Sequence, residues 1–580
     1  MVVTSTLPPI DIPNTNIVDY VFGECKRLRG DDHPLFVDSS TGDSLTIGQV
    51  QSMTRRFATG LRNKCNIRAG DTVAIVARNS MNFPIAAYGV VTTGAICTPA
   101  NPSYTPSELA HQLTDSQCKI VIVGDGAKDT VTAALKLVPQ KVEHVLMMDE
   151  TKSLCSQSIF EIMGSEDDEE DTVTAALFSA SGRPSDIANA PAYLCYSSGT
   201  TGKPKGVLLT HRNMVANAMQ INGLKQLDEP LAADSVASKQ GYETFLGLAP
   251  FCHAYGLSYV LHSSVSLGGK IVIMPSYSFD KFLAAVTDYR ITFGYLVPPI
   301  VCALSKDPRV DEYNLSSMHT ILSGGAALSP SLIETTEERL RGVRVIQGYG
   351  MTEMCPAITM LATCHRNPFS IGILMPNCEA KVVDSENNEI DPAESGELCF
   401  KGPNVMPGYL NNQAATDHIF DSDGFLHTGD IGHIDAEGFF YITDRKKEII
   451  KYKGFQVSPS ELESILAEHP DIEDAAVMSV YDDNQATEIP RAYFVLAKHA
   501  FEDSNSCDSG YMPGVAEDIA RGQAVVDWLH ERVARYKRLR GGFILIDNIP
   551  RSPAGKIIRN SLRNMEHVTS RESSTASSTI

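Results

Sequence analysis

The chain has 580 residues, of which 43% are hydrophobic and 21% charged, and its formal net charge is −21 at pH 7. This is the composition of a globular protein that can bury a large core. Its acidity argues against sequence-independent binding to nucleic acid or to an anionic membrane surface.

The thirteen cysteines are scattered without a C-x-x-C pair, and residues 1–16 lack the basic start of a signal peptide. We therefore expect reduced thiols in a soluble, cytoplasmic protein. A peroxisome is the alternative location, although the C-terminal Ser578-Thr-Ile580 lacks the basic middle residue of the usual address. Apolar runs are interrupted by Gly or Pro well short of the roughly 20 residues that a membrane-spanning helix requires, so no integral membrane segment is predicted.

The first part of the chain alternates between apolar runs and helical patterns. Apolar runs at 72–77, 120–123 and 145–148 alternate with helical stretches such as 46–64 and 107–116. This alternation predicts βαβ units around a largely parallel sheet. Residues 151–190 are acidic and rich in Ser and Ala, which predicts a surface excursion.

The stretch from Ser197 to Gly206 contains three glycines, four hydroxyl side chains and two lysines. Glycine tolerates positive φ, so such a loop can turn its backbone N–H groups inward and predicts a polyphosphate site. It is not a Walker A motif, because Pro204-Lys-Gly206 stands where Gly-Lys-Ser/Thr is required. We expect the loop between a strand at 192–196 and a helix that begins near Thr210, whose side chain can cap it.

The sequence pattern changes twice in the second half of the chain. Residues 396–444 show strand-like pairs and Gly-rich turns, which predict a small β-rich subdomain. Beyond them we expect an α+β module with a helix at 459–468, strands at 475–480 and 492–497, a helix at 525–536 and a strand at 542–546. The predicted organisation is a large N-terminal α/β domain, residues 1–444, and a small mobile C-terminal domain, residues 445–580. A polar loop is expected at 500–515, and the Ser/Thr-rich tail from about residue 565 is predicted to be disordered.

Seven short motifs follow the Gly-rich loop. They are Pro250-Phe-Cys-His-Ala-Tyr-Gly256, Ser323-Gly-Gly-Ala-Ala-Leu328, Gln347-Gly-Tyr-Gly-Met-Thr-Glu353, His427-Thr-Gly-Asp430, Asp444-Arg445, Lys453-Gly-Phe-Gln-Val457 and Pro550-Arg-Ser-Pro-Ala-Gly-Lys556. In this order the chain resembles the adenylate-forming acyl-CoA synthetase superfamily, close to its 4-coumarate–CoA ligase branch. The resemblance implies that a hydrophobic carboxylic acid is activated with ATP as an acyl-AMP and then transferred to CoA. ATP, Mg²⁺ and CoA are the implied cofactors.

The resemblance implies an ATP site that several motifs share. Glu353, with the hydroxyl of Ser197, would bind Mg²⁺, a cation that suits oxygen ligands. Thr352 would contact the α-phosphate. The groups that would hold the β- and γ-phosphates belong to Ser197, Ser198, Gly199, Thr200, Thr201 and Lys205.

The nucleoside part of ATP is implied to lie against other motifs. Asp430 resembles a ribose clamp, since the two oxygens of a carboxylate can accept hydrogen bonds from both ribose hydroxyls. Arg445 would add a second contact to the ribose. The residues implied around the adenine are Gly348 and Tyr349, which would flank it, with Ala326 and Gln347 nearby.

Catalysis is implied to depend on a lysine that moves. Lys556 would bridge the substrate carboxylate and the α-phosphate and would offset the charge that builds in the transition state. Rotation of the small domain about Lys447 would then withdraw Lys556 and bring Lys453 and Gly454 alongside the pantetheine arm of CoA. The residues implied to support catalysis are Lys451, Gln456 and His253, the last beside the acyl carbonyl.

The acyl pocket implied by the resemblance departs from the coumarate branch at one position. Coumarate ligases commonly place a Lys where Leu322 stands, facing the phenol hydroxyl. Because Leu has no donor, a buried para-hydroxyl would stay unsatisfied at a cost of about 1–3 kcal/mol. We therefore expect an apolar aliphatic or arylalkanoic acid, and Ser276 likewise replaces a Lys that is common near the CoA phosphates. The pocket residues are His253, Tyr255, Leu322, Gly325, Gly350, Pro356 and Ala357.

Other activities remain open from the sequence, because the same fold supports several. One is a free-standing adenylation enzyme that loads a carrier protein, although no carrier domain follows and His253 stands where amino-acid-activating domains tend to place an Asp. Another is a luciferase-like oxygenase. A non-catalytic binding protein is expected to have lost Lys556 or Glu353, and both are present. The predicted partner is a small-molecule carboxylic acid, and the predicted assembly is a monomer or a weak homodimer.

Overall fold

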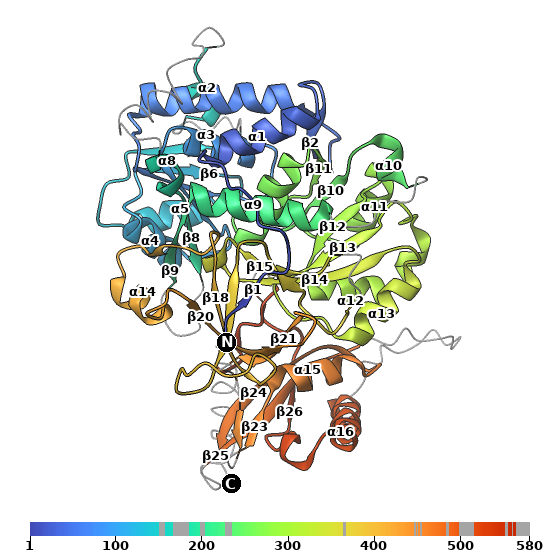
Figure 1. The fold of residues 1–580 in the computed structure, drawn as a ribbon. Coiled ribbons are helices and arrows are strands. Elements are labelled where there is room, and N and C mark those ends of the chain that lie inside the picture. Colours follow the sequence, from blue (N-terminus) through green and yellow to red (C-terminus); the bar gives the residue numbers. More distant parts are fainter. Residues whose placement is uncertain are drawn as a thin grey trace, which may run out of the picture.

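The computed structural model places the chain in a large body with a smaller one beneath it (Figure 1). The large body extends from β1 (Val3–Thr4) to β21 (Phe440–Arg445), and the smaller one follows β21. No described helix is long and apolar enough to cross a lipid bilayer. The described residues are 1–149, 157–165, 185–197, 204–226, 235–362, 367–445, 448, 450–452, 455–482, 487–497, 515–551, 555–559 and 561–563.

Seven strands form the first sheet of the large body. Their spatial order is β19 (Gly408–Tyr409), β9 (Lys205–Thr210), β8 (Pro191–Ser197), β5 (Ile96–Ala100), β4 (Thr72–Val76), β6 (Ile120–Val123) and β7 (His144–Met147). The pairs from β8 to β7 are parallel. The helices of this part are α2 (Ile47–Cys65), α3 (Asn82–Thr92), α4 (Pro106–Asp115) and α5 (Lys128–Leu135). The predicted βαβ units are confirmed.

Nine strands form the second sheet. Their spatial order is β16 (Ile373–Leu374), β15 (Ala357–Met360), β14 (Arg344–Gly350), β13 (Thr320–Ser323), β12 (Phe293–Leu296), β10 (Thr244–Gly247), β11 (Lys270–Ile273), β2 (Pro34–Asp38) and β3 (Ser44–Thr46). From β14 to β2 all neighbours are parallel. The carboxyl ends of β12, β13 and β14 therefore meet at one edge of the sheet, and three of the sequence motifs begin there or nearby.

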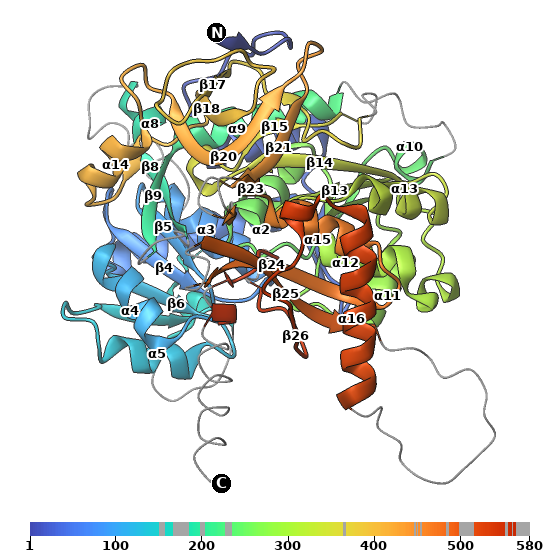
Figure 2. The ribbon, with the colours of Figure 1, turned by 90° about the horizontal axis from the view of Figure 1, so that it is seen from below.

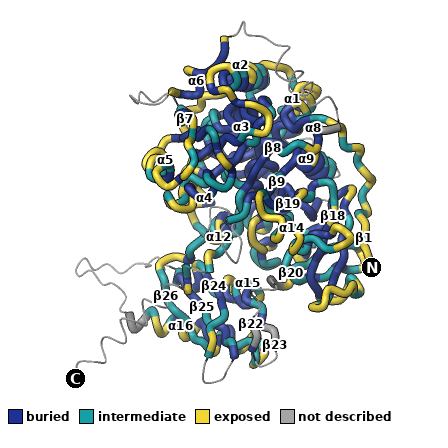
Figure 3. Tube along the Cα trace, turned by 90° about the vertical axis from the view of Figure 1, so that its left-hand side faces the viewer, coloured by how far each residue is buried: buried dark blue, intermediate teal, exposed yellow. Residues whose placement is uncertain are grey.

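Helices cover both faces of the second sheet, so its strands are buried on both sides. On one face Leu246, Leu296 and Ile321 pack in a core with the helices α11 (Phe279–Tyr289), α12 (Pro298–Lys306) and α13 (Pro330–Arg339). On the other face Leu322 and Tyr295 join a larger core that reaches the first sheet. That core includes α9 (His211–Gln226) and the π-helix η1 (Gly256–Ser264). Figure 3 shows these buried segments in the middle of the large body.

The third sheet has five strands in the order β1, β17 (Glu379–Val383), β18 (Gly396–Lys401), β20 (Leu426–Ile434) and β21. It confirms the β-rich subdomain predicted at 396–444 and adds β1 and β17 to it. The remaining elements of the large body are α1 (Ile17–Leu28), α6 (Ile159–Ile162), α8 (Ser185–Asn189), α10 (Val236–Gln240), η2 (Pro308–Glu312), η3 (Thr352–Met354) and α14 (Gln413–Ile419).

The small body is an α+β unit with its own apolar core. Its elements are the hairpin β22 (Ile450–Tyr452) and β23 (Phe455–Val457), α15 (Pro459–Ala467), β24 (Ile472–Asp482), β25 (Thr487–Leu496), α16 (Val515–Arg532), η4 (Arg535–Lys537) and β26 (Phe543–Leu545). Figure 2 views the molecule from below and shows β24, β25 and α16 next to one another. The α+β prediction for this part of the chain is confirmed.

Two sequence expectations about local structure are wrong. The Gly-rich loop does not lead directly into a helix, because β9 pairs antiparallel with β8 and the loop is the tip of this hairpin. Thr210 does cap the following helix, since its Oγ accepts a hydrogen bond from the backbone N–H of Asn213 at 3.1 Å. The last helix begins at Val515 rather than Val525, since its first turns are polar and lack the apolar periodicity that marks a buried face.

Candidate active site

The Gly-rich loop is anchored at both ends by the β8–β9 hairpin. Ser197 and Lys205 are directly opposite each other in the register of the two strands. His111 Nε2 lies 2.9 Å from the backbone oxygen of Pro204 and fixes the point where the chain returns from the loop. The predicted phosphate contacts of Ser198, Gly199, Thr200 and Thr201 lie outside the described residues.

A tyrosine that the sequence analysis did not select connects the loop to Glu353. The Tyr409 hydroxyl donates a hydrogen bond to Glu353 Oε1 at 2.9 Å, and the Lys205 ammonium lies 4.6 Å from the centre of the Tyr409 ring. Burial and the neighbouring Glu353 raise the pKa of Tyr409, so its hydroxyl remains a donor at neutral pH. A tyrosine after a Gly in a β-rich stretch gives no sequence signal that separates it from an ordinary core residue.

Asp430 is held by a second tyrosine and by its own turn. The Tyr349 hydroxyl donates to Asp430 Oδ2 at 2.6 Å, and the carboxylate is only 5% exposed. The preceding Gly429 has φ +73°, and its N–H donates to Glu397 Oε1 at 2.9 Å. Arg445 is the cross-strand partner of Asp430, which places the two predicted ribose contacts on neighbouring strands.

The predicted adenine residues lie in and beside β14. The amide oxygen of Gln347 accepts a hydrogen bond from the backbone N–H of Leu328 at 2.9 Å. Its amide nitrogen donates to the backbone oxygen of Pro368 at 3.3 Å. Gln347 thus fixes the loop that carries Ala326. The oxygen and the nitrogen of its side-chain amide are both bonded to backbone atoms of the protein. Gly348 and Tyr349 follow it on the same strand.

The turn that carries Thr352 and Glu353 depends on a close backbone contact. A Cβ atom on Gly350 would lie 1.7 Å from the backbone oxygen of Pro356, so this position accepts only glycine. Gly350 and Pro356, both predicted to line the acyl pocket, are therefore in direct contact. The neighbouring Ala357 is held by Asn217, whose side chain donates to its backbone oxygen at 2.8 Å.

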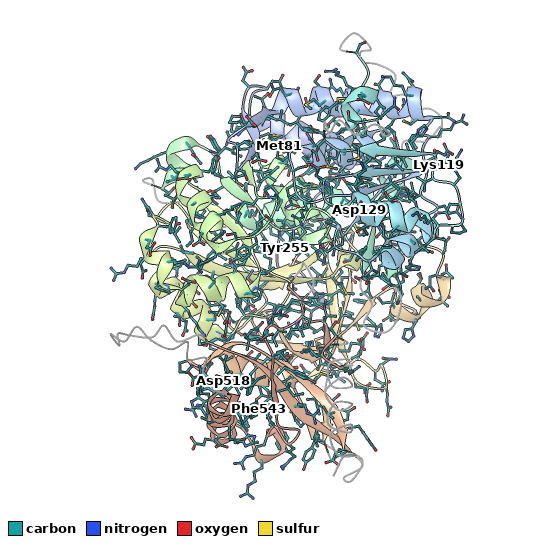
Figure 4. All side chains as sticks on the ribbon, turned by 180° about the vertical axis from the view of Figure 1, so that it is seen from behind. Met81, Lys119, Asp129, Tyr255, Asp518 and Phe543 are labelled. Atoms are coloured by element: carbon teal, nitrogen blue, oxygen red, sulfur yellow. The ribbon has the colours of Figure 1, made fainter. Side chains whose placement is uncertain are left out.

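Tyr255 and Leu322 form the central part of the predicted acyl pocket. The Tyr255 hydroxyl donates to the backbone oxygen of Leu322 at 2.9 Å, and Leu322 is 1% exposed. The Tyr255 ring lies 3.4 Å from the place of a Cβ on Gly324, and Gly325 next to it has φ +89°. Figure 4 shows Tyr255 in the interior of the large body. The structure brings these residues to the carboxyl ends of β12 and β13.

Lys556 is close enough to His253 for its positive charge to act on the imidazole. Burial lowers the pKa of His253 to about 4, and the positive charge of Lys556 contributes to this shift. His253 is therefore neutral at pH 7, and its Nδ1 accepts a hydrogen bond from the backbone N–H of Tyr255 at 3.2 Å. The charge of Lys556 thus acts on a residue that precedes it by more than half of the chain.

The loop that carries Lys556 is docked on the large body. A Cβ on Gly555, which has φ +80°, would lie 3.2 Å from Cβ of Val297, directly after β12. Arg551 holds the loop from the other side, because its guanidinium donates to Gly555 O at 2.8 Å and to both Asp474 oxygens at 2.7 and 3.1 Å. Arg551 is a second residue that the sequence analysis did not assign.

The remaining predicted residues of the small body lie on or near the hairpin β22–β23. Lys451 and Gln456 are cross-strand partners in it, which places them side by side along the hairpin backbone. Lys447, Lys453 and Gly454 lie outside the described residues.

Comparison with known proteins identifies the family of the chain. The model of the AMP-binding enzyme family matches residues 25–410, and that of the AMP-binding enzyme C-terminal domain matches residues 461–556. The chain belongs to the AMP-binding enzyme family. The second match lies entirely within the small body and ends at Lys556.

Relatives of this AMP-binding enzyme match along almost the whole chain. It is 36% identical over 572 residues to 4-coumarate–CoA ligase 2 of Nicotiana tabacum, with 96% of each chain covered. It is 34% identical over 571 residues to probable 4-coumarate–CoA ligase 1 of Dictyostelium discoideum, with 97% of each covered. The ATP-bound structure of MatB from Rhodopseudomonas palustris has a TM-score of 0.77 and 26% identity, over 95% of this chain and 99% of that one.

Proposed function

We propose that this AMP-binding enzyme activates an apolar carboxylic acid as an acyl-AMP, with release of pyrophosphate, and then transfers the acyl group to CoA. The class, an ATP-dependent acid–thiol ligase that works through an acyl-AMP, is that of the curated relatives. The apolar nature of the acid and the roles of individual residues are the parts that we add.

The observation that carries the proposal is the docking of the Lys556 loop on the large body, where Gly555 lies against Val297 and the charge of Lys556 acts on His253. A carboxylate and an α-phosphate repel each other when they approach. An ammonium group between them offsets the negative charge that builds in the transition state. His253 is neutral and does not compete with Lys556 for the anionic groups.

We assign the other roles in the first half-reaction from the same site. A carboxylate oxygen attacks the α-phosphorus, the bond to the bridging oxygen breaks, and pyrophosphate leaves with that electron pair. Transfer of this kind depends chiefly on positioning and charge neutralisation. Asp430, Arg445 and Tyr349 would hold the nucleoside, and Thr352 would contact the α-phosphate. The residues proposed for the β- and γ-phosphates are Ser197, Ser198, Gly199, Thr200, Thr201 and Lys205.

The residues at Glu353 fit a magnesium ion that accompanies ATP. The carboxylate is 5% exposed, and Tyr409 occupies one of its oxygens. The second oxygen receives no hydrogen bond from the described residues, which leaves a buried anionic ligand for a hard cation. Glu353 and the hydroxyl of Ser197 would hold Mg²⁺, and the ion would neutralise charge on the ATP phosphates.

For the second half-reaction we propose that the small domain, residues 445–580, rotates against residues 1–444 about Lys447. The polar contacts between the two bodies support this. Lys306 Nζ donates to the backbone oxygen of Ala467 at 3.0 Å, and Ser331 Oγ donates to Glu468 Oε1 at 3.2 Å. Exposed contacts of this kind contribute little stability and can be exchanged at low cost. Rotation would withdraw Lys556 and bring the β22–β23 hairpin, with Lys453 and Gly454, to CoA.

The proposed acid is apolar because Leu322 offers no hydrogen-bond donor at the wall of the pocket. Tyr255 does not replace it, since its hydroxyl is already bonded to the backbone of Leu322. A buried para-hydroxyl would therefore stay unsatisfied, which costs about 1–3 kcal/mol. Octanoate, cinnamate and similar acids fit such a wall better than 4-coumarate. We place the enzyme in the cytoplasm, with the peroxisome as the alternative, and propose a monomer or a weak homodimer.

A panel of acids tests the proposal. Thioester formation is measured with ATP, Mg²⁺ and CoA for octanoate, cinnamate and 4-coumarate, on the wild type, on Leu322→Lys and on the volume-matched control Leu322→Met. We expect the wild type to favour the two apolar acids. Leu322→Lys should lower their kcat/KM, because an unpaired ammonium in an apolar wall must lose its proton or admit water. Leu322→Met should keep the ranking, and a wild type that favours 4-coumarate contradicts the apolar assignment.

A further inference from the structure

Two more tyrosines pack against Tyr255. Tyr259 comes from the π-helix η1, and Tyr295 comes from β12, beside Leu322 in the register of the sheet. The ring centres of Tyr255 and Tyr259 are 5.1 Å apart, and those of Tyr259 and Tyr295 are 5.5 Å apart. The three rings are at most 8% exposed and form one packed layer, with Tyr259 in contact with both others.

Tyr259 reaches from this layer to the strand that carries the nucleotide motif. Its hydroxyl oxygen lies 3.3 Å from the place of a Cβ on Gly348, just as the Tyr255 ring lies 3.4 Å from that of Gly324. Gly324 follows β13 and Gly348 lies near the end of β14, and these strands are neighbours. The two rings therefore occupy the space above the carboxyl ends of both strands. A side chain in place of either glycine would compete with a ring for this space.

The neighbours of Tyr259 are fixed by hydrogen bonds. Tyr255 is bonded to the backbone of Leu322. The Tyr295 hydroxyl accepts a hydrogen bond from Lys225 and lies 2.9 Å from Ser264 Oγ. The Lys225 ammonium lies 5.0 Å from the centre of the Tyr295 ring, which adds a cation–π contact.

Tyr259 is held differently, by packing rather than by polar contacts. Among the described residues its hydroxyl has a single hydrogen-bond partner, the thioether sulfur of Met360 at 4.0 Å. A contact to sulfur at that distance is weak. The ring of Tyr259 can therefore be removed without breaking a strong polar contact, and the two anchored rings cannot easily collapse into the space that it leaves.

We propose that Tyr259 is the distal wall of the acyl pocket and sets the longest acid that the enzyme accepts. This inference rests on the proposed function, and it narrows the substrate class to acids with a single ring or a medium aliphatic chain. A long-chain fatty acid would have to displace the Tyr259 ring from between two fixed neighbours. Replacement of this ring by a small side chain opens the pocket toward β12, into an apolar cavity that a longer chain can fill.

The test compares octanoate with palmitate, as kcat/KM for CoA-thioester formation, on the wild type and on variants. Tyr259→Ala should raise the palmitate-to-octanoate ratio about tenfold or more, since each methylene that a pocket gains or loses changes rates by roughly 10–200-fold. Tyr259→Phe keeps the ring and should keep the ranking of the two acids. Phe293→Ala is the matched control, because Phe293 packs against Tyr295, with ring centres 5.0 Å apart. Phe293→Ala also opens a buried cavity, but it should leave the ranking of octanoate and palmitate unchanged.

The outcomes separate this inference from the proposed function. A wild type that forms no thioester with any acid contradicts the proposed function. A wild type that prefers palmitate, or a folded Tyr259→Ala with an unchanged ratio, overturns the distal-wall assignment while the ligase activity stands. An equal shift in Phe293→Ala also overturns it, since loosening of the core would then be the cause. If Tyr259→Ala fails to fold, Tyr259→Leu leaves a smaller cavity and should shift the ratio in the same direction.

Discussion

Two carboxylates of the proposed site are each paired with a tyrosine hydroxyl. Tyr349 donates to Asp430, and Tyr409 donates to Glu353. A neutral donor orients a buried carboxylate without cancelling its charge, whereas a lysine in the same place would neutralise it. The hydroxyl thus fixes the orientation of each carboxylate, which suits contact with ribose hydroxyls in one case and with a cation in the other.

At the residue scale, Asp430→Ala is expected to raise the KM for ATP strongly. Two hydrogen bonds from the ribose hydroxyls to a charged acceptor are lost, and at about 1.5–3 kcal/mol each this amounts to a 100-fold effect or more. The measurement is steady-state kinetics with varied ATP. Asp417→Ala, on the exposed helix α14, is the control for a lost surface charge. Unchanged ATP kinetics in Asp430→Ala would show that the ribose lies elsewhere.

Lys556→Ala is expected to separate the two half-reactions. Formation of acyl-AMP should fall by at least about 100-fold, because the charge between carboxylate and α-phosphate is no longer offset. Thioester formation from a chemically prepared acyl-AMP and CoA should be largely retained, since that step builds no charge beside this lysine. Single-turnover assays of each step on the wild type and the variant provide the comparison. An equal loss in both steps contradicts the assignment of Lys556.

At the element scale, the proposed rotation depends on the short segment between β21 and β22. Lys447→Pro is expected to retain acyl-AMP formation and to lose thioester formation. Proline fixes φ near −65° and restricts the residue before it, so the segment cannot adopt a second backbone conformation. The rates of pyrophosphate release and of thioester formation are measured on the same preparation.

Lys447→Ala is the matched control for this substitution. It removes the side chain but leaves φ free, so both half-reactions should persist. A Lys447→Pro enzyme that makes thioester at the wild-type rate would place the pivot at another residue.

The sequence predicts the elements well where their pattern depends on burial alone. The parallel strands β4, β6 and β7 are short apolar runs between helical patterns, and all three were expected. The π-helix η1 was not expected. Its residues are buried throughout and show no periodicity that separates one helix type from another. The first turns of α16 are polar, so the sequence shows no apolar face there from which a helix could be predicted.

The candidate site was predictable as a set of motifs, but its internal contacts were not. Asp430, Glu353 and Lys556 were assigned because each stands in a recognisable motif. Tyr409 lies 56 residues from Glu353 in the chain, and this contact depends on how the sheets pack. Arg551 stands in the same motif as Lys556, but its partners are the backbone oxygen of Gly555 and the distant Asp474, which the motif alone does not reveal.

At the scale of the whole molecule, the buried His211 and His262 and the half-buried His253 connect stability to pH. Burial lowers the pKa of His211 and of His253 to about 4, with a contribution from Lys556 in the case of His253. Burial, followed by the charge of His211, lowers the pKa of His262 to about 3. In the unfolded chain a histidine takes up its proton near pH 6.5. The unfolded state therefore binds more protons below that pH, and the free energy of unfolding should fall as the pH falls from about 6.5 toward about 4.

His262→Gln tests this dependence outside the proposed site. Glutamine can still bond to the Tyr193 hydroxyl, which lies 3.1 Å from His262 Nε2, but it does not titrate. The loss of unfolding free energy between pH 7 and pH 5 should shrink by about 2 kcal/mol, close to the contribution of one histidine over that range. Denaturant unfolding at several pH values provides the measurement, with replacement of the exposed His418 as the control. An identical pH profile in His262→Gln contradicts the burial argument.

The central claim is that this molecule joins an acid to AMP before CoA takes part. Exchange of labelled pyrophosphate into ATP, in the absence of CoA and with octanoate present or absent, tests it most directly. Formation of acyl-AMP is reversible at the enzyme, so we predict exchange that depends on both the acid and Mg²⁺ and disappears in Lys556→Ala. Release of ADP and phosphate in place of pyrophosphate, or exchange that is independent of the acid for every acid tried, would contradict the account.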